Sequence, residues 1–248
     1  MENKLKNKTF IITGASRGIG FELVKFLLPF EVRLILIASK ESSFGKLKSL
    51  VSKTSEFNSN NSEIIYYPID LSNSEEIKKA EIEISSKFGK IDFLINNAGI
   101  GIFKKLIDFN FDEFDNLINV NLKAPFGMIK SVLPEMINQK SGVIINVLSV
   151  VAKTPFANSS IYGATKAGLL QMTECLRMEV REYGIKIINV FPGATATEIW
   201  SPKALEKLSH KMLNPEDVAE TVFEIIKLST IQTMMIEDIQ IRPQGGDL

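Results

Sequence analysis

Short apolar runs alternate along the chain with longer stretches in which apolar residues recur every three or four positions. The short runs are rich in β-branched residues, and several are apolar throughout, as in strands that are covered on both faces of a sheet. The longer stretches have the period of amphipathic helices. The pattern predicts strands over residues 9–13, 32–38, 64–69, 91–96, 142–148, 186–191 and 235–241. It predicts helices over residues 19–28, 44–51, 74–88, 111–138, 159–183 and 215–228.

This strict alternation of strand and helix is typical of parallel sheets with right-handed crossover connections. No internal repeat or long linker interrupts it, although residues 54–62 are polar and rich in asparagine. We expect that segment to be a solvated loop. The predicted fold class is therefore α/β: one doubly wound Rossmann-type domain over residues 1–248, with a seven-stranded parallel sheet and helices on both faces.

Charge and cysteine content narrow the function classes. The 29 basic side chains balance the 29 acidic ones, so the net charge of zero favours neither a nucleic-acid nor a membrane partner. The N-terminus lacks the apolar core of a signal peptide, and no apolar run is long enough to span a membrane. Cys175 is the only cysteine, which excludes a disulfide within the chain and a cysteine-based zinc site. We predict a cytoplasmic protein without a metal, in which Cys175 is a buried small side chain in a helix.

A glycine-rich turn joins the first predicted strand to the first predicted helix, in the sequence Thr13-Gly14-Ala15-Ser16-Arg17-Gly18-Ile19-Gly20. Glycines at such a turn allow the backbone to approach a pyrophosphate, which the free N–H groups of the helix N-terminus then bind. The alternative is a plain strand-to-helix turn. The flanking elements favour a dinucleotide site formed by Gly14, Ser16, Arg17, Gly18, Ile19 and Gly20.

The end of the second strand indicates which dinucleotide is bound. An acidic residue about twenty positions beyond the glycine turn would favour NAD. This chain has Ser39 and Lys40 there, and Arg17 lies in the turn itself. A hydroxyl and two cations suit the 2′-phosphate of NADP, although Glu41 weakens the signal and the two cations could be merely solvated. We predict NADP (NADPH) as the cofactor, with NAD as the alternative.

The candidate chemistry lies on the following elements. Tyr162 and Lys166 are four positions apart at the start of a predicted helix, so they share a helix face. A nearby ammonium favours the phenolate and would bring the tyrosine into a useful range for acid/base catalysis. Ser149 ends the preceding strand, at the same carboxyl edge of the sheet. Asn121 precedes Pro125 inside a helical stretch, which suggests a bend; the alternative for Asn121 is a surface amide.

In this order along nearly the whole chain, the motifs resemble the short-chain dehydrogenase/reductase family in its form of about 250 residues, with a Tyr-x-x-x-Lys active site. They are the glycine turn, Asp70 after the third strand, Asn96-Asn97-Ala98-Gly99, Asn121, Ser149, Tyr162-Gly163-Ala164-Thr165-Lys166, and Pro192-Gly193 with Thr197. The chain departs mildly from the family in having Leu148 before Ser149 and Thr165 before Lys166, where serines are frequent.

The resemblance implies a role for each of these residues. Tyr162 would protonate the carbonyl oxygen, and Ser149 would hydrogen-bond it. Lys166 would lower the pKa of Tyr162 and hold the nicotinamide ribose, while Asn121 would fix a water of a proton relay. The remaining cofactor contacts would come from Asp70, Leu71, Asn97, Ala98, Gly99, Pro192, Gly193, Thr195 and Thr197.

The predicted function is an NADP(H)-dependent oxidoreductase that reduces a ketone or aldehyde or oxidises the corresponding alcohol; a 3-oxoacyl thioester is one candidate substrate. The alternative is a non-catalytic dinucleotide-binding sensor or scaffold on the same fold, since fold does not imply function. Residues 194–213 are expected to form a mobile substrate lid. Trp200 and Phe156 lie on loops near this site, where a substrate-lining role and plain packing fit equally well. Family resemblance implies a homodimer or homotetramer.

Overall fold

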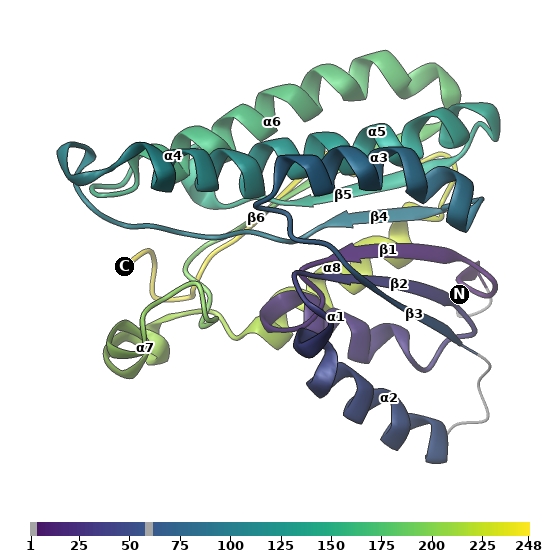
Figure 1. The fold of residues 1–248 in the computed structure, drawn as a ribbon, viewed down its shortest axis with the longest axis horizontal. Helices are drawn as coiled ribbons and strands as arrows, with labels where there is room; N and C mark the ends of the chain where they lie inside the picture. The colour runs from purple at the N-terminus through teal and green to yellow at the C-terminus, as the bar shows by residue number, and fades with distance from the viewer. Residues whose placement is uncertain (1–3, 58–61) are drawn as a thin grey trace.

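Seven parallel strands form one sheet in the computed structural model, which describes residues 4–57 and 62–248 (Figure 1). Their order is β3-β2-β1-β4-β5-β6-β7. The strands are β1 (Thr9–Thr13), β2 (Arg33–Ala38), β3 (Glu63–Pro68), β4 (Phe93–Asn96), β5 (Gly142–Val147), β6 (Ile185–Pro192) and β7 (Asp238–Ile241). Every residue of β1, β4 and β5 is buried, which explains why these strands are apolar nearly throughout.

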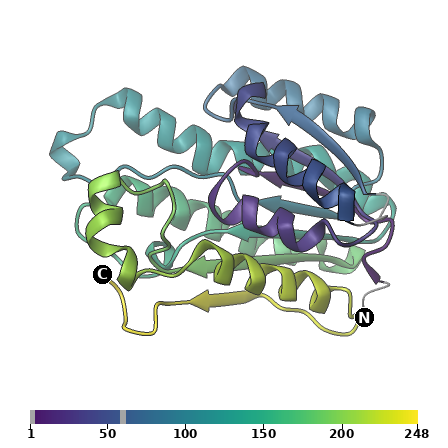
Figure 2. The same cartoon turned by 90° about the horizontal axis from the view of Figure 1, so that it is seen from below.

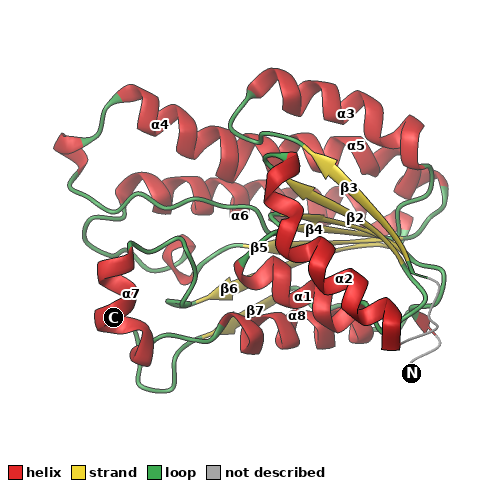
Figure 3. Ribbon diagram, turned by 60° about the horizontal axis from the view of Figure 1, so that its bottom comes forward, coloured by secondary structure: helices red, strands yellow, loops and turns green. Residues whose placement is uncertain are grey.

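Helices cover both faces of this sheet. Figure 1 shows α3 (Ser74–Phe88), α5 (Ala124–Asn138) and α6 (Ser160–Val180) above it. Below it lie α1 (Gly18–Leu27), α2 (Gly45–Phe57) and α8 (Pro215–Ser229). The two layers enclose separate apolar clusters, one built on Phe10, Ile12 and the α1 and α8 side chains, the other on Ile11, Ile144 and the α3 and α5 side chains. Figure 3 shows the twisted sheet between the layers, so the α/β prediction with a seven-stranded parallel sheet is confirmed.

The remaining helical segments lie at the carboxyl ends of the strands and in connections between elements. They are the 3₁₀ turns η2 (Glu41–Phe44), η3 (Leu106–Asp108), η5 (Val150–Ala152), η6 (Arg181–Tyr183) and η7 (Ser209–Lys211), the π-helical turn η4 (Asn119–Lys123), and the helices α4 (Phe111–Ile118) and α7 (Pro202–Leu208). Figure 2 shows β7 at one edge of the sheet, with α7 near the C-terminus of the chain.

The boundaries differ from the sequence prediction most in three places. The helix predicted over residues 111–138 is divided into α4 and α5 by the π turn η4, which lies where a bend was expected around Asn121. The α2 helix continues to Phe57, so the prediction of a loop from residue 54 is wrong there; residues 58–61 lie outside the described part of the chain. The last strand begins at Asp238 and not at residue 235, because Lys186 Nζ donates to the carbonyls of Ser229, Ile231 and Met234 and holds that segment as a loop.

The prediction that Cys175 is buried is also wrong, because its thiol is exposed. The buried side chains of α6 in this region include Leu169, Thr173, Leu176 and Val180, which follow the three-to-four period of one helix face. Cys175 falls outside that face. Its apolar neighbours in the sequence do not indicate which face of the helix is buried.

Within the described residues, no helix is long and apolar enough to cross a membrane, and no group of His, Cys, Asp and Glu could hold a metal ion.

Candidate active site

A cavity of about 1160 Å³ opens at the carboxyl edge of the sheet, where β1 and β4 are neighbours although β2 and β3 follow β1 in the chain. Ligands bind at such switch points in open α/β sheets. Most residues expected at the site line the cavity: Gly14, Ser16, Arg17, Gly18, Ile19, Ser39, Asp70, Leu71, Asn97, Ala98, Gly99, Ser149, Tyr162, Lys166, Pro192, Gly193, Thr195 and Thr197. Gly20, Lys40 and Asn121 do not line it.

The glycine turn is tied to the neighbouring strand β4. Asn97 Nδ2 donates to the carbonyls of Thr13, at 2.9 Å, and Gly14, at 3.2 Å. Thr13 Oγ1 accepts from the backbone N–H groups of Asn97 and Ala98, both at 3.0 Å. A Cβ atom on Gly20 would lie 2.4 Å from the Gly14 oxygen, so the close approach requires a glycine although Gly20 does not face the cavity. The turn therefore presents the α1 N-terminus to the cavity, as an anion site requires.

Tyr162 and Lys166 both lie buried at the start of α6. Lys166 Nζ donates to the Val147 carbonyl at 3.0 Å and lies 5.9 Å from the centre of the Tyr162 ring. Burial raises the pKa of Tyr162 to about 12, although a hydrogen bond with Ser149 lowers that pKa in part. Burial also lowers the pKa of Lys166 to about 8.

These pKa shifts differ from the expected lowering of the Tyr162 pKa by Lys166. Both groups are removed from water, and burial disfavours the charged form of each: the phenolate of Tyr162 and the ammonium of Lys166. At this separation the ammonium does not offset the loss of hydration. Tyr162 is therefore a neutral phenol at neutral pH, and it can donate a proton.

Asn121 lies in the π turn and is only 1% exposed, so the surface-amide alternative is wrong. Its Nδ2 atom donates to the Ile100 carbonyl at 2.9 Å and to Thr165 Oγ1 at 3.2 Å, and its Oδ1 atom accepts from the Ile100 N–H at 2.9 Å. A Cβ atom on Gly99 would lie 3.5 Å from both Asn121 Oδ1 and Lys166 Nζ. Asn121 thus fixes the loop after β4 against α6, behind the cavity wall.

The part of the cavity next to the glycine turn and the start of α2 is lined by Arg17, Ser39, Ser42, Ser43 and Lys46. Lys40 is exposed and does not contribute to this wall. The reason is the 3₁₀ turn η2, which separates β2 from α2 and brings the first turn of α2 to the cavity. The sequence predicts the 2′-phosphate site at the residues directly after β2, whereas Lys46 lies in the first turn of α2.

Three buried asparagines form a ladder across the ends of β4, β5 and β6. Asn96, Asn146 and Asn189 are register partners on adjacent strands. Asn96 Nδ2 donates to Asn146 Oδ1 at 3.0 Å, Asn146 Nδ2 donates to Asn189 Oδ1 at 3.1 Å, and Thr173 Oγ1 also donates to that oxygen. The ladder joins the strands that lead to Asn97 and to the Lys166 acceptor. An asparagine near the end of three apolar strands is the sequence signal that could have revealed it.

Segment 194–213 projects from a short parallel bridge between Thr195 and Leu213. The Leu213 N–H donates to the Ala194 carbonyl at 2.8 Å, and the Ala196 N–H donates to the Leu213 carbonyl at 2.9 Å. Inside the segment, Trp200 Nε1 donates to the Thr195 carbonyl at 3.1 Å. Trp200 and Phe156 both line the cavity, so the structure favours the lining role over plain packing.

Comparisons with known proteins agree with this arrangement. A family model described as short chain dehydrogenase matches residues 8–207. An uncharacterised oxidoreductase of Staphylococcus aureus strain MW2 is 31% identical over 96% of this chain and 98% of its own length. A Staphylococcus epidermidis oxidoreductase is 28% identical over 97% of this chain and 99% of its own length.

Two solved structures are similar over nearly the whole fold. A metagenomic short-chain oxidoreductase in complex with NADP has a TM-score of 0.79 and 29% identity, over 97% of this chain and 99% of that one. A short-chain dehydrogenase of Sphingobium yanoikuyae in complex with NADPH has a TM-score of 0.81 and 25% identity, over 96% and 88%. The chain belongs to the short chain dehydrogenase family, an oxidoreductase family that acts on alcohol and carbonyl groups.

Proposed function

We propose that this chain reduces a ketone or aldehyde with NADPH, or oxidises the corresponding alcohol, and that Tyr162 is its general acid. The observation that carries the proposal is a buried phenol and a buried ammonium on one helix face, inside the cavity that the glycine turn also lines. The raised pKa of Tyr162 keeps it protonated, and the side chain of Ser149 lowers that pKa in part. Ser149 would orient the carbonyl oxygen toward the phenol.

The cavity fits a dinucleotide. The glycine turn leaves open space beside the N–H groups of the α1 N-terminus, where an anion can bind. Gly14 and Gly18 have positive φ angles, and a Cβ atom on Gly20 would clash with the Gly14 oxygen, so larger side chains at these positions would disrupt the turn. When bound, the cofactor supplies the hydride. Arg17, Ser39, Ser42, Ser43 and Lys46 would hold the adenosine end, and their charge and hydroxyls favour a 2′-phosphate. The NADP and NADPH complexes of the two similar structures support this choice.

After Tyr162 gives its proton to the carbonyl oxygen, the resulting phenolate must be reprotonated. Lys166 Nζ lies 5.9 Å from the centre of the Tyr162 ring, and the lowered pKa of Lys166 makes proton transfer near neutral pH favourable. We assign Asn121 a positioning role: it holds the backbone at Ile100 and the start of α6, so that Lys166 Nζ keeps its place beside Gly99.

The test is the Tyr162→Phe variant in a screen of NADPH oxidation against ketones, aldehydes and 3-oxoacyl thioesters. General acid catalysis contributes about 10²–10⁴-fold, so turnover should fall by that factor while NADPH affinity stays near the wild-type value. Tyr183→Phe, a tyrosine outside the cavity, is the matched control and should keep full activity. Wild-type turnover in Tyr162→Phe would refute the assignment.

The sequence left a non-catalytic dinucleotide-binding sensor as an alternative, but the buried pair of Tyr162 and Lys166 in the cavity favours the enzyme. Such a sensor would bind NADPH without turning over any carbonyl, and the same screen separates it from the enzyme.

Homo-oligomerisation is part of our proposal and is supported by exposed aromatic side chains on α4 and α5, Phe111 and Phe126. Light scattering of the purified protein would test it, and a monomer at micromolar concentration would contradict it.

A further inference from the structure

Three aromatic rings from distant parts of the chain meet beside the proposed general acid. The Phe103 ring lies edge-to-face against the Tyr162 ring, with centroids 5.4 Å apart and an interplanar angle of 76°. Phe103 also stacks on Trp200, with centroids 4.9 Å apart and an interplanar angle of 16°. All three residues line the cavity. We call Phe103 and Trp200 the aromatic wall; it forms the surface next to the point where a carbonyl must reach the Tyr162 hydroxyl.

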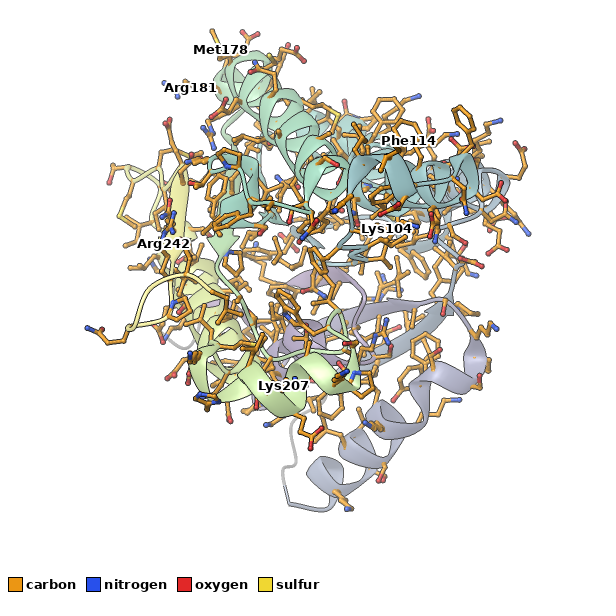
Figure 4. All side chains as sticks on the ribbon, turned by 90° about the vertical axis from the view of Figure 1, so that its left-hand side faces the viewer. Lys104, Phe114, Met178, Arg181, Lys207 and Arg242 are labelled. Atoms are coloured by element: carbon orange, nitrogen blue, oxygen red, sulfur yellow. The ribbon has the colours of Figure 1, made fainter. Side chains whose placement is uncertain are left out.

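The Phe103 ring is fixed by its own loop. A Cβ atom on Gly101 would lie 2.8 and 2.9 Å from two atoms of the ring, so the loop folds tightly around the phenylalanine only because residue 101 is a glycine. The next residue, Lys104, donates to both carboxylate oxygens of Glu113 at 2.6 Å and so ties the loop to the first turn of α4, the helix that also carries Phe114 (Figure 4). Phe103, the half of the wall that lies outside segment 194–213, is therefore already in place before a substrate arrives.

Charged groups are scarce near this wall. Within the described part of the chain, the basic side chains that line the cavity are Arg17, Lys46 and Lys166. The first two lie with the glycine turn and α2, at the proposed adenosine end, and Lys166 is held by the Val147 carbonyl. The acidic side chains that line the cavity are Asp70, Glu198 and Asp247, and Asp247 is paired with Arg242. An anionic group on the substrate would therefore lose its hydration at the wall without gaining a partner.

We propose that the substrates of this enzyme are uncharged ketones with a flat aromatic substituent, selected by Phe103 and Trp200. The inference rests on the proposed function and specifies its substrate class. A ring next to the reacting carbonyl would meet the Phe103 ring, whose two neighbours already show the stacked and edge-to-face geometries that aromatic pairs prefer. Such contacts discriminate an aromatic ring from a saturated ring of similar size by about three- to tenfold.

The experiment compares ketones that differ in one property. Acetophenone and cyclohexyl methyl ketone share a carbon skeleton but differ in aromaticity, and methyl phenylglyoxylate and phenylglyoxylate differ in charge. Because the intrinsic reactivities of aryl and alkyl ketones differ, the measured quantity is the change in the acetophenone-to-cyclohexyl ratio of kcat/KM on mutation. We expect Phe103→Leu and Trp200→Leu each to lower that ratio about three- to tenfold. The ester should be preferred to the acid by about tenfold or more.

Two variants control for unspecific damage. Phe103→Tyr keeps the ring and should keep the wild-type ratio. Phe26→Leu removes an aromatic side chain on α1 that does not line the cavity, and it should also leave the ratio unchanged. NADPH affinity, measured by fluorescence, should be unchanged in all variants. A ratio that stays at the wild-type value in both leucine variants, or a preference for phenylglyoxylate over its ester, would overturn the inference. Failure of the wild type to reduce any ketone while it binds NADPH would instead overturn the proposed function.

Discussion

The glycine at position 20 allows the most direct test of the site geometry. In Gly20→Ala the added Cβ atom would lie 2.4 Å from the Gly14 carbonyl oxygen and 2.6 Å from Asn97 Nδ2. The first atom is backbone, and the second is held by hydrogen bonds to Thr13 and Gly14. Overpacking costs about 1–3 kcal/mol, and a lost hydrogen bond about 1 kcal/mol more, whereas alanine in a helix regains about 0.5–1 kcal/mol. We expect a net loss of about 2 kcal/mol.

The same displacement should reach the cofactor site, because the clash pushes the Gly14 end of the turn away from α1. NADPH affinity should fall by tenfold or more, the equivalent of about 1.4 kcal/mol. Gly168→Ala is the matched control, since it makes the same change within α6, where the nearest atom, Leu122 Cδ2, is 3.5 Å away in ordinary contact. It should stabilise the protein by about 0.5–1 kcal/mol.

Urea unfolding and fluorescence titration with NADPH measure the two effects. We expect the free energy of unfolding to fall in Gly20→Ala and to rise in Gly168→Ala, although both are the same substitution within a helix. If Gly20→Ala unfolds at the same urea concentration as Gly168→Ala and binds NADPH as the wild type does, the close approach at Gly20 does not constrain the turn, and our account of the glycine spacing is wrong.

Four further outcomes are expected. Since the lowered pKa of Lys166 means that its charge is present below pH about 8 and lost above it, NADPH affinity should fall as pH rises through that value, and Lys166→Met should lack the step in a pH series of titrations. Lys46→Asp should weaken NADPH binding relative to NADH, while Lys40→Asp should change it little; the reverse order would contradict the assignment of the 2′-phosphate site. Asn146→Leu should lower the free energy of unfolding by about 2–4 kcal/mol, because two buried amides lose their partner. Segment 194–213 should gain protection from hydrogen exchange when NADPH and substrate bind, and equal strong protection in both states would exclude a lid.

Much of the fold follows from local patterns. Strands such as β1 and β5 are buried on both faces, so their residues are apolar nearly throughout, and the helices between them must carry an apolar stripe. Strict alternation then leaves few topologies other than a doubly wound parallel sheet. The glycine turn and the pair Tyr162 and Lys166 could be assigned from spacing alone, since each lies within one element or one turn.

Other features depend on how distant elements meet. The rotation of α6 about its axis decides that Cys175 faces solvent, and the 3₁₀ turn η2 decides that Lys46 and not Lys40 reaches the cavity. Burial, a property of the packed molecule, outweighs the nearby ammonium in setting the pKa of Tyr162.

The asparagine ladder and the aromatic wall show the same limit most clearly. Asn96, Asn146 and Asn189 become neighbours only through the register of three strands, and Phe103 meets Trp200 only because the loop after β4 and the segment after β6 lie over the same edge of the sheet. Periodicity along a chain records which side of an element is buried, but it carries no information about the partner that buries it. The partner is decided by crossover connections and by packing, and in this protein those long-range contacts shape the proposed substrate pocket.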